Sequence, residues 1–391
     1  MNNLNPEKKK LLVVGFVVTI LYSLHLAIPL YINSTLLAKY FLKENINLIY
    51  ILSGIFSLFF AIYISRFIKK YHNYNTTLAI MLVDFVFTLL LGLSQNIYVV
   101  GFSFIITAIT ISALYITLNL FIEEFSDHRD EGVVRGIFLT LLNTGILLSP
   151  LIAASALANI GFSGIYIVSA IMLIPMSILI RHYYKNVSEP KYKNISFRKG
   201  IVETLRDKNI FGVMSAMFAL ECFYLTLVIY LPLFLLQNTN ISMTTYLGVI
   251  MPFVLIPFVI LPYQMGMLAD KKTGEKEFLL LGLGIISICL FLIPFIDSNS
   301  IFIWGGLLFI SRVGAAILET MIFTYFFKKT EKSDAGLVAL FGNMRTIATI
   351  AVPIVGAILL YMTGKIDYVF IATALFVAYT IIPASKIIDT K

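Results

Sequence analysis

Six ionisable residues interrupt the long apolar runs of this chain, and they are the side chains best placed to do chemistry. They are His25, Asp84, Glu221, Arg312, Glu319 and Arg345. Since a charge at the centre of a bilayer costs about 2.5–3.5 kcal/mol even on the lenient insertion scale, a charged residue in such a run needs a partner or a task. The tasks to expect are binding a polar solute and carrying a proton.

Glu221 is the first candidate for carrying a proton. It lies in the sequence FALECFYLTLVIY, near the middle of its apolar run. Because removal from water disfavours the charged form of a carboxyl group, a glutamate at this depth can take up and release a proton. The alternative is a glutamate that is permanently hydrogen-bonded to a neighbouring helix. Tyr224, three residues on, is a candidate for contact with a solute, although packing explains it equally well.

Arg312 and Glu319 lie seven residues apart in one apolar run. Seven steps along a helix return to within about 20° of the same face and advance about 10.5 Å along the axis, so both side chains can line one cavity. We therefore place both in a substrate or proton pathway. The alternative is an internal ion pair that stabilises the helix bundle.

The other three intramembrane residues carry weaker expectations. His25, in LYSLHLAIPLY, is either a pathway ligand or proton relay, or a hydrogen-bonded packing residue. Asp84 is expected to pair within the N-terminal half. Arg345 is expected to be structural: it either snorkels towards the interface or meets a carboxylate such as Asp84 or Glu319.

Membrane-spanning helices must position these residues. Of the 391 residues, 59% are hydrophobic and 13% are charged, which is about half the charged fraction of a soluble protein. Long apolar runs without strict alternation predict helices and exclude a β-barrel. We expect an all-α polytopic membrane protein with twelve spans, at about 11–33, 47–67, 76–95, 97–121, 133–158, 160–183, 210–236, 243–268, 278–296, 299–326, 337–361 and 367–386.

The distribution of basic residues predicts the orientation of these spans. If the N-terminus is cytoplasmic, 24 of the 29 Lys and Arg lie on the cytoplasmic side, and Lys39, Lys43 and Lys365 lie outside. Basic residues concentrate in cytoplasmic loops, so both termini are expected in the cytoplasm, with the chain in the cytoplasmic membrane. The net charge of +8 then reflects topology and contact with anionic lipid, and it requires no nucleic acid partner.

The chain divides into two halves that resemble each other. We expect an N-terminal six-helix bundle (1–183), a basic cytoplasmic linker (184–209) with a short surface helix around 197–207, and a C-terminal six-helix bundle (210–391). The segments GILLSPLIAA and ATIAVPIVGA contain Pro150 and Pro353, which are 203 residues apart. Together with similar DEGVV and DAGLV segments before them, these markers predict parallel structural repeats.

A charged loop between two apolar runs carries the most specific motif. Residues 266–276 read GMLADKKTGEK and resemble the loop motif G-x-L-A-D-[RK]-x-x-G-[RK]-[RK] of the major facilitator superfamily. Glu275 departs from the basic residue usual there, and Ser65 replaces the acidic residue in the corresponding loop of the first half. The resemblance implies two six-helix bundles that alternate around a central site lined by spans one, four, seven and ten.

The same resemblance gives roles to two further groups of residues. Gly145, Pro150, Pro353 and Gly356 lie in segments similar to the proline motif of family antiporters, and we expect them to serve in packing or as hinges. In the loop, Gly266 would let helices approach closely. Asp270, with Lys271 and Gly274 in its turn, would form a conformational latch against the start of span five. The helix N-terminus there and Arg135 would attract the carboxylate.

No motif for other chemistry is present. The sequence lacks a G-x-x-x-x-G-K-[ST] loop, an H-E-x-x-H, a paired-cysteine motif and a G-x-S-x-G. Cys222 and Cys289 lie in apolar runs as packing residues. We therefore expect no enzyme, catalytic residue, cofactor or metal.

The sequence as a whole predicts a monomeric secondary transporter that exports a small organic solute by proton antiport. One alternative is proton-linked or facilitative uptake of a sugar, another metabolite or an anion. Another is a non-transporting sensor or scaffold with a transporter-like fold.

Overall fold

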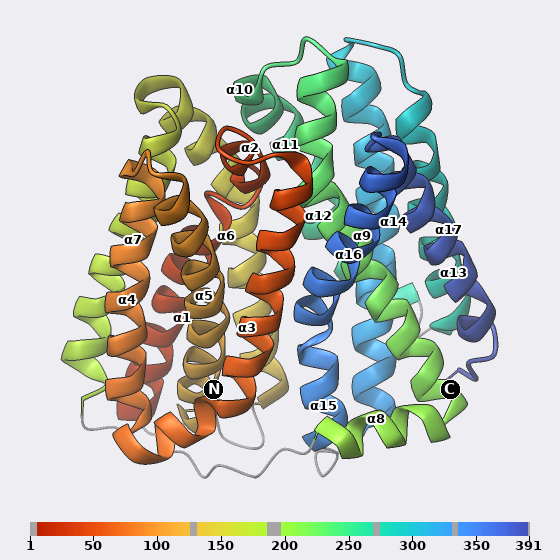
Figure 1. Ribbon diagram of the computed structural model, residues 1–391. Coiled ribbons are helices and arrows are strands. Elements are labelled where there is room, and N and C mark those ends of the chain that lie inside the picture. The colour runs from red at the N-terminus through yellow and green to blue at the C-terminus, as the bar shows by residue number, and fades with distance from the viewer. Residues whose placement is uncertain (1–5, 126–130, 186–196, 269–273, 331–334, 390–391) are drawn as a thin grey trace. The chain divides into compact units, whose positions relative to one another are not determined.

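The fold is built from helices, as Figure 1 shows in a computed structural model. The structure describes residues 6–125, 131–185, 197–268, 274–330 and 335–389, and no strand occurs within these ranges. Twelve helices in this part of the chain are long and apolar enough to cross a membrane. The predicted all-α membrane fold is therefore confirmed.

The chain forms two compact units. The first contains residues 1–41 and 52–192, and the second contains 42–51 and 193–391. The start of the second predicted span thus groups with the second unit. There the buried side chain of Asn47 accepts a hydrogen bond from the Tyr230 hydroxyl at 2.7 Å.

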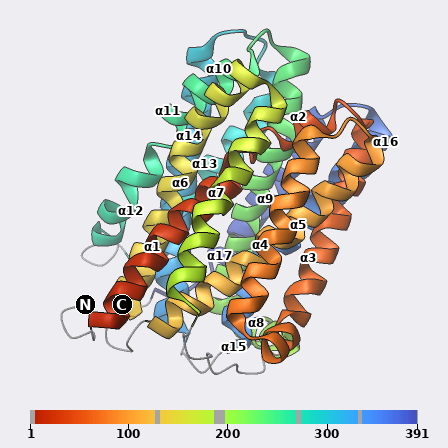
Figure 2. The ribbon, with the colours of Figure 1, turned by 90° about the vertical axis from the view of Figure 1, so that its left-hand side faces the viewer.

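Six long helices make up most of the first unit: α1 (Pro6–Ala27), α3 (Lys43–Tyr71), α4 (Asn73–Leu93), α5 (Ile97–Phe125), α6 (Glu131–Ile160) and α7 (Phe162–Tyr183). Helices α1 and α7 run side by side (Figure 2), and α1 also packs on α6. The helices enclose an apolar core that includes Val18, Phe121 and Met176. At Gly145 a Cβ atom would lie 2.5 Å from Ser23 Cβ, so α1 and α6 cross in near-backbone contact.

The second unit has more interruptions. Its helices are α8 (Phe197–Arg206), α9 (Lys208–Asn238), α10 (Met243–Thr245), α11 (Met251–Val254), α12 (Pro257–Leu268), α13 (Lys276–Leu292), α14 (Ile301–Lys329), α15 (Ala335–Gly342), α16 (Met344–Thr363) and α17 (Asp367–Ala384). A π-helical turn (Tyr246–Ile250) lies between α10 and α11, and a 3-10 turn (Ile293–Phe295) follows α13. The predicted spans at 243–268 and 337–361 are therefore each broken into shorter helices.

Proline explains another difference from the predicted spans. The first span was expected to run to residue 33, but α1 ends at Ala27 and a short helix, α2 (Asn33–Leu37), follows a turn. Pro29 has no backbone N–H and cannot bond the carbonyl of His25, four residues earlier. The carbonyl of His25 accepts from the Ser169 hydroxyl at 2.7 Å instead.

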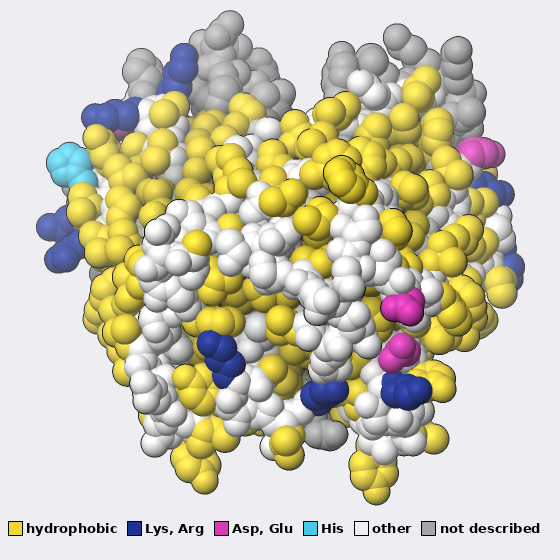
Figure 3. Space-filling model, turned by 90° about the horizontal axis from the view of Figure 1, so that it is seen from above, with side chains coloured by type: hydrophobic (Ala, Val, Ile, Leu, Met, Phe, Trp, Pro, Cys, Tyr) yellow, Lys and Arg dark blue, Asp and Glu magenta, His cyan; other side chains and the backbone are white. Residues whose placement is uncertain are grey.

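The linker contains the expected short helix, α8, which lies across the end of α15 (Figure 1). A Cβ atom on Gly200 would lie 2.6 Å from the carbonyl carbon of Gly336, so the two backbones touch. Hydrophobic side chains are exposed over much of the end that Figure 3 shows, between polar and backbone atoms. Large exposed side chains such as Phe302 and Leu375 are those expected of a chain that faces lipid.

Candidate functional site

Four of the predicted pathway residues meet in the second unit, on the facing sides of α9 and α14. The Tyr224 hydroxyl donates to Glu319 Oε2 at 2.7 Å, which is the length of a strong hydrogen bond to a carboxylate. The guanidinium carbon of Arg312 lies 5.7 Å from the centre of the Tyr224 ring and 5.3 Å from that of Phe223. These residues and Glu221 form what we call the α9–α14 polar cluster.

Arg312 is almost fully buried, at 3% exposure. Its two aromatic neighbours offer the negative faces of their rings, which stabilises a buried cation. Its charge is also close enough to Glu319 to act on it electrostatically. However, the Nε atom of Arg312 has no hydrogen-bond partner in the described part of the chain. Because a buried donor without a partner costs free energy, this atom is a candidate contact for a water molecule or a polar ligand.

Glu221 has the complementary feature. It is 8% exposed, and its Oε2 atom is buried without a hydrogen-bond partner among the described residues. This oxygen of the carboxyl group is therefore not held by a hydrogen bond from the described residues. The predicted alternative, a glutamate bonded to a neighbouring helix, is not what this oxygen shows.

Arg345 joins the cluster from a third helix. It is exposed in the first turn of α16, and its charge acts on both Glu221 and Glu319. The α9–α14 polar cluster and Arg345 together provide two arginines and two glutamates. Arg312 is buried, whereas Arg345 is exposed. Of the two carboxylates expected near Arg345, Glu319 lies within its electrostatic range. Glu221 does so as well. The sequence did not mark Arg345 as part of the pathway.

His25 lies apart from this cluster, in the first unit. Its Nε2 atom lies 3.0 Å from Asp84 Oδ2, and both residues are almost fully buried. The expected pairing of Asp84 within the N-terminal half is therefore observed. Sequence reasoning did not foresee that His25 would be its partner, because the two residues come from α1 and α4.

The charged loop is described only at its end. Asp270 and Lys271 lie outside the described residues, as does the side chain of Arg135, so the latch remains a prediction. At Gly266 no described atom lies within 4 Å of an added Cβ. The close helix approach expected there stays a prediction. Gly274 has a φ of 88°, a left-handed conformation that favours glycine.

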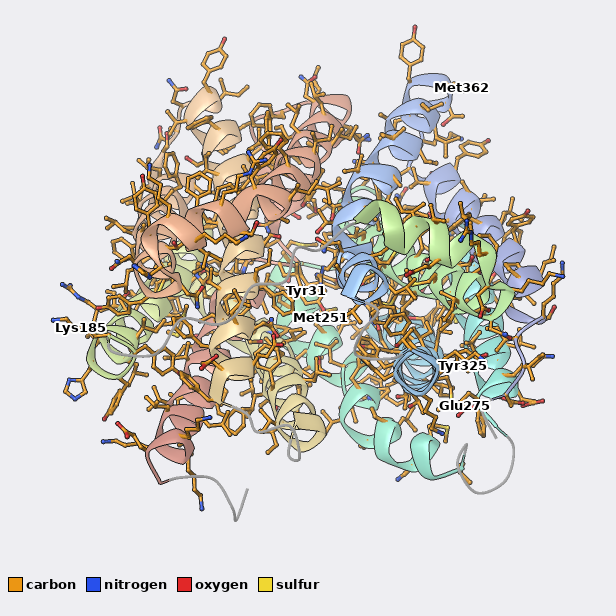
Figure 4. The ribbon with its side chains drawn as sticks, turned by 90° about the horizontal axis from the view of Figure 1, so that it is seen from below. Tyr31, Lys185, Met251, Glu275, Tyr325 and Met362 are labelled. Carbon is orange, nitrogen blue, oxygen red and sulfur yellow. The ribbon has the colours of Figure 1, made fainter. Side chains whose placement is uncertain are left out.

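A partner that the sequence did not indicate holds the end of this loop. The backbone N–H groups of Glu275 and Lys276, at the start of α13, donate to Asp389 Oδ1 at 2.8 and 2.9 Å. Lys328 Nζ lies 2.8 Å from Glu275 Oε1. The Tyr325 hydroxyl donates to the Ile388 carbonyl at 2.8 Å, at the end of the unit where Figure 4 labels Tyr325 and Glu275. Glu275, the acidic departure from the motif, thus has a basic partner on α14.

The glycines of the two proline segments lie at helix crossings. Gly145 contacts Ser23 of α1, and a Cβ atom on Gly356 would collide with the hydroxyl of Tyr230 on α9. Pro150 and Pro353 lie inside α6 and α16. These positions are consistent with the expected packing role, whereas a hinge role remains a prediction.

Comparison with known proteins gives the family. The sequence pattern described as Major Facilitator Superfamily matches residues 11–353, which is most of the chain. This protein belongs to the major facilitator superfamily. It is therefore a multi-pass membrane transporter, which implies a small-molecule substrate and a bilayer environment. A search of curated proteins found no match.

Solved structures of transporters share the fold. A bacterial homologue of the human lysosomal transporter Spinster, inward-facing and unoccupied, has a TM-score of 0.75 at 12% identity, with 97% of each chain covered. An auto-inhibited peptide transporter of the POT family has a TM-score of 0.73 at 11% identity, with 98% of each chain covered. Identities this low establish a common fold and leave the substrate open.

Proposed function

We propose that this transporter couples proton movement to the export of a small organic solute across the cytoplasmic membrane by alternating access. The observation that carries the proposal is Glu221, a buried carboxyl group with an oxygen that lacks a hydrogen-bond partner in the described chain. It lies within the electrostatic reach of an accessible arginine, Arg345. Such a group can hold either a proton or an ionic interaction, which is the property that coupling requires.

The coupling works through the exchange of these two states. Protonated Glu221 has no ionic attraction to Arg345, whereas ionised Glu221 attracts it. A solute that binds well in only one of the two states makes proton release and solute binding depend on each other. Glu319 is the second choice for the coupling group, because the Tyr224 hydroxyl already bonds one of its oxygens.

Export is supported by the proline segment of α6. Gly145 and Pro150 match the antiporter motif of the family in part, and Gly145 lies at the crossing with α1. Uptake of an anionic solute is the second candidate, favoured by the buried Nε of Arg312. The sensor alternative is less well supported, because the proteins of the same fold named above are transporters. We also propose that both termini are cytoplasmic and that the protein works as a monomer.

The test begins with a thermal-shift screen of small solutes on the purified protein. Solutes that raise its unfolding temperature are then offered to proteoliposomes under an imposed pH gradient. Accumulation in vesicles that are acidic inside supports proton antiport, and accumulation only in vesicles that are acidic outside supports proton-linked uptake. Absence of flux for every stabilising solute would favour the sensor.

The role of Glu221 is tested in the same vesicles. Glu221→Gln is expected to abolish accumulation driven by the pH gradient while solute exchange without a gradient persists. Glu277→Gln is a matched control, because Glu277 is an exposed residue in the first turn of α13. Gradient-driven accumulation that is unchanged by Glu221→Gln would refute the assignment.

A further inference from the structure

The His25–Asp84 pair in the first unit is a second buried titratable site that the α9–α14 polar cluster does not use. His25 is 1% exposed and Asp84 is 0% exposed. Their contact, 3.0 Å from Nε2 to Oδ2, joins α1 to α4. A buried acid and a buried base in direct contact can hold one proton between them. The position of that proton decides whether both groups are charged or both are neutral.

Ser169 determines what the other ring nitrogen does. His25 Nδ1 lies 3.0 Å from the Ser169 carbonyl oxygen and 3.0 Å from its hydroxyl oxygen. The hydroxyl already donates its hydrogen to the His25 carbonyl, so both Ser169 oxygens act as acceptors towards Nδ1. Nδ1 therefore carries a hydrogen, and Nε2 is the nitrogen that shares a proton with Asp84.

The contact between His25 and Asp84 then contains one exchangeable proton. The pair is either an imidazolium beside a carboxylate or a neutral imidazole beside a carboxylic acid, and each form has one proton between Nε2 and Oδ2. The Thr88 hydroxyl donates to the other oxygen, Oδ1, at 3.3 Å. Without the shared proton, a nitrogen lone pair would face a carboxylate, and two acceptors in contact in a dry interior are unfavourable.

A cavity beside His25 has room for water that could take up this proton. It has a volume of about 60 Å³, and its polar wall is formed by His25, Asn33, Thr88, Thr107, Tyr166 and Ser169. Since roughly 10–15 Å³ of such volume holds one water molecule, the cavity has room for more than one. The cavity lies towards the ends of α1 and α4 and the starts of α5 and α7, where the turns at 94–96 and Gly161 connect the helices.

One charged group lies at the same end of the first unit as the pair: the Nζ atom of Lys39 is 3.4 Å from the centre of the Phe162 ring, at the start of α7. The remaining titratable group in the cavity wall is Tyr166, whose hydroxyl donates to Asn33 Oδ1 at 2.8 Å. The other charged residues described on the helices around the pair lie at the opposite helix ends, about 15 Å or more along the axes. They are Glu7, Lys8, Lys9 and Lys10 on α1, Glu123 and Glu124 on α5, and Arg181 and His182 on α7.

We propose that His25 and Asp84 form a proton-binding site of the first unit, which exchanges its proton through this cavity. In the release step the Nε2–H bond of His25 breaks and a cavity water takes the proton, so the neutral pair becomes an anionic one. Rebinding reverses the step. Because the proton holds two acceptors together, its release weakens the contact between α1 and α4, and the occupancy of the site controls how tightly these helices are joined.

The experiment follows the histidine ring directly and needs no solute or transport. The full-length protein, labelled with ¹⁵N in its histidine rings, is titrated in lipid nanodiscs in the Glu221→Gln background, so that this proposal and the proposed function fail separately. The chain has four histidines, and His25→Gln identifies the His25 signals. We expect the His25 Nε2 signal to move in one step as the pH rises, while Nδ1 keeps its hydrogen.

Two further variants make the result decisive. Asp84→Asn removes the carboxylate that shares the proton, so the His25 titration curve is expected to shift away from that of the parent protein. Ala108→Leu fills the cavity wall and is expected to slow proton exchange at Nε2 severalfold, whereas Ala158→Leu, at an exposed position on α6, leaves it unchanged. Constant His25 signals across the pH range, or identical exchange in both leucine variants, would overturn the proposal and leave the pair as a permanent structural contact.

Discussion

Replacement by alanine is expected to have different effects on stability at Gly356 and at Gly284. At Gly356, on α16, an alanine Cβ would collide with the Tyr230 hydroxyl and lie 2.6 Å from its Cζ atom. At Gly284, inside α13, no described atom lies within 4 Å of the added Cβ. Both glycines lie within helices, so the two variants share the gain in helix propensity and differ in packing.

The magnitudes follow from these contacts. Tyr230 is fully buried and its hydroxyl donates to Asn47, so the ring cannot move away freely. Overpacking of this kind costs about 1–3 kcal/mol, and a lost hydrogen bond adds about 0.5–1.5 kcal/mol. Replacing a helical glycine by alanine stabilises by about 0.5–1 kcal/mol where there is space. Gly356→Ala should therefore destabilise the protein, and Gly284→Ala should leave it equal or more stable.

Thermal unfolding of the purified protein in one detergent provides the assay. One kcal/mol shifts the unfolding temperature by about 2–4 °C in a unit of roughly 200 residues, so the two variants should separate by several degrees. Adding Tyr230→Phe to Gly356→Ala removes the nearest colliding atom and should recover part of the loss, which a double-mutant cycle measures. If Gly356→Ala unfolds at the same temperature as Gly284→Ala, the packing argument is wrong.

Three other predictions concern single contacts. Asp389→Ala removes the acceptor at the start of α13 and should lower stability by about 0.5–2 kcal/mol, measured as faster hydrogen exchange at the amides of residues 275–279. Asp389→Asn keeps an acceptor, so these amides should exchange more slowly than in Asp389→Ala. Equal exchange in the two variants would contradict the capping role. Tyr224→Phe removes the hydrogen bond to Glu319 and should lower stability by about 1.5–3 kcal/mol, measured as a lower unfolding temperature, and an unchanged temperature would count against that bond. Gly145→Val should destabilise the α1–α6 crossing more than Gly145→Ala does, and thermal unfolding of both variants checks the order.

The sequence indicated the buried ionisable residues better than it indicated their partners. Glu221, Arg312 and Glu319 could be found because a charge in an apolar run is costly and therefore conspicuous. Their partners come from helices far away in the chain, and spacing within one helix cannot identify them. Arg345 illustrates the limit, since two carboxylates were open to it and only the fold brings Glu221 within its electrostatic range as well.

Helix ends and loop contacts were harder to predict for a different reason. Hydropathy does not register a break such as the one after Ala27, because the residues on both sides are apolar; Pro29 was the available signal. Asp389 carried no signal at all. A carboxylate near a basic, solvated segment has many possible partners, and its choice of the α13 N-terminus depends on the tertiary fold.

The contact made by Asp389 also has a consequence for how the protein is made. Glu275, whose backbone N–H it accepts, is 114 residues earlier in the chain. During synthesis α13 must enter the membrane before its capping residue exists, and α14 to α17 are made in between. The start of α13 can therefore be capped only after the helices of the second unit have been made. In a ribosome-bound chain that stops before Asp389, the amides of residues 275–279 should exchange hydrogen faster than in the full-length protein.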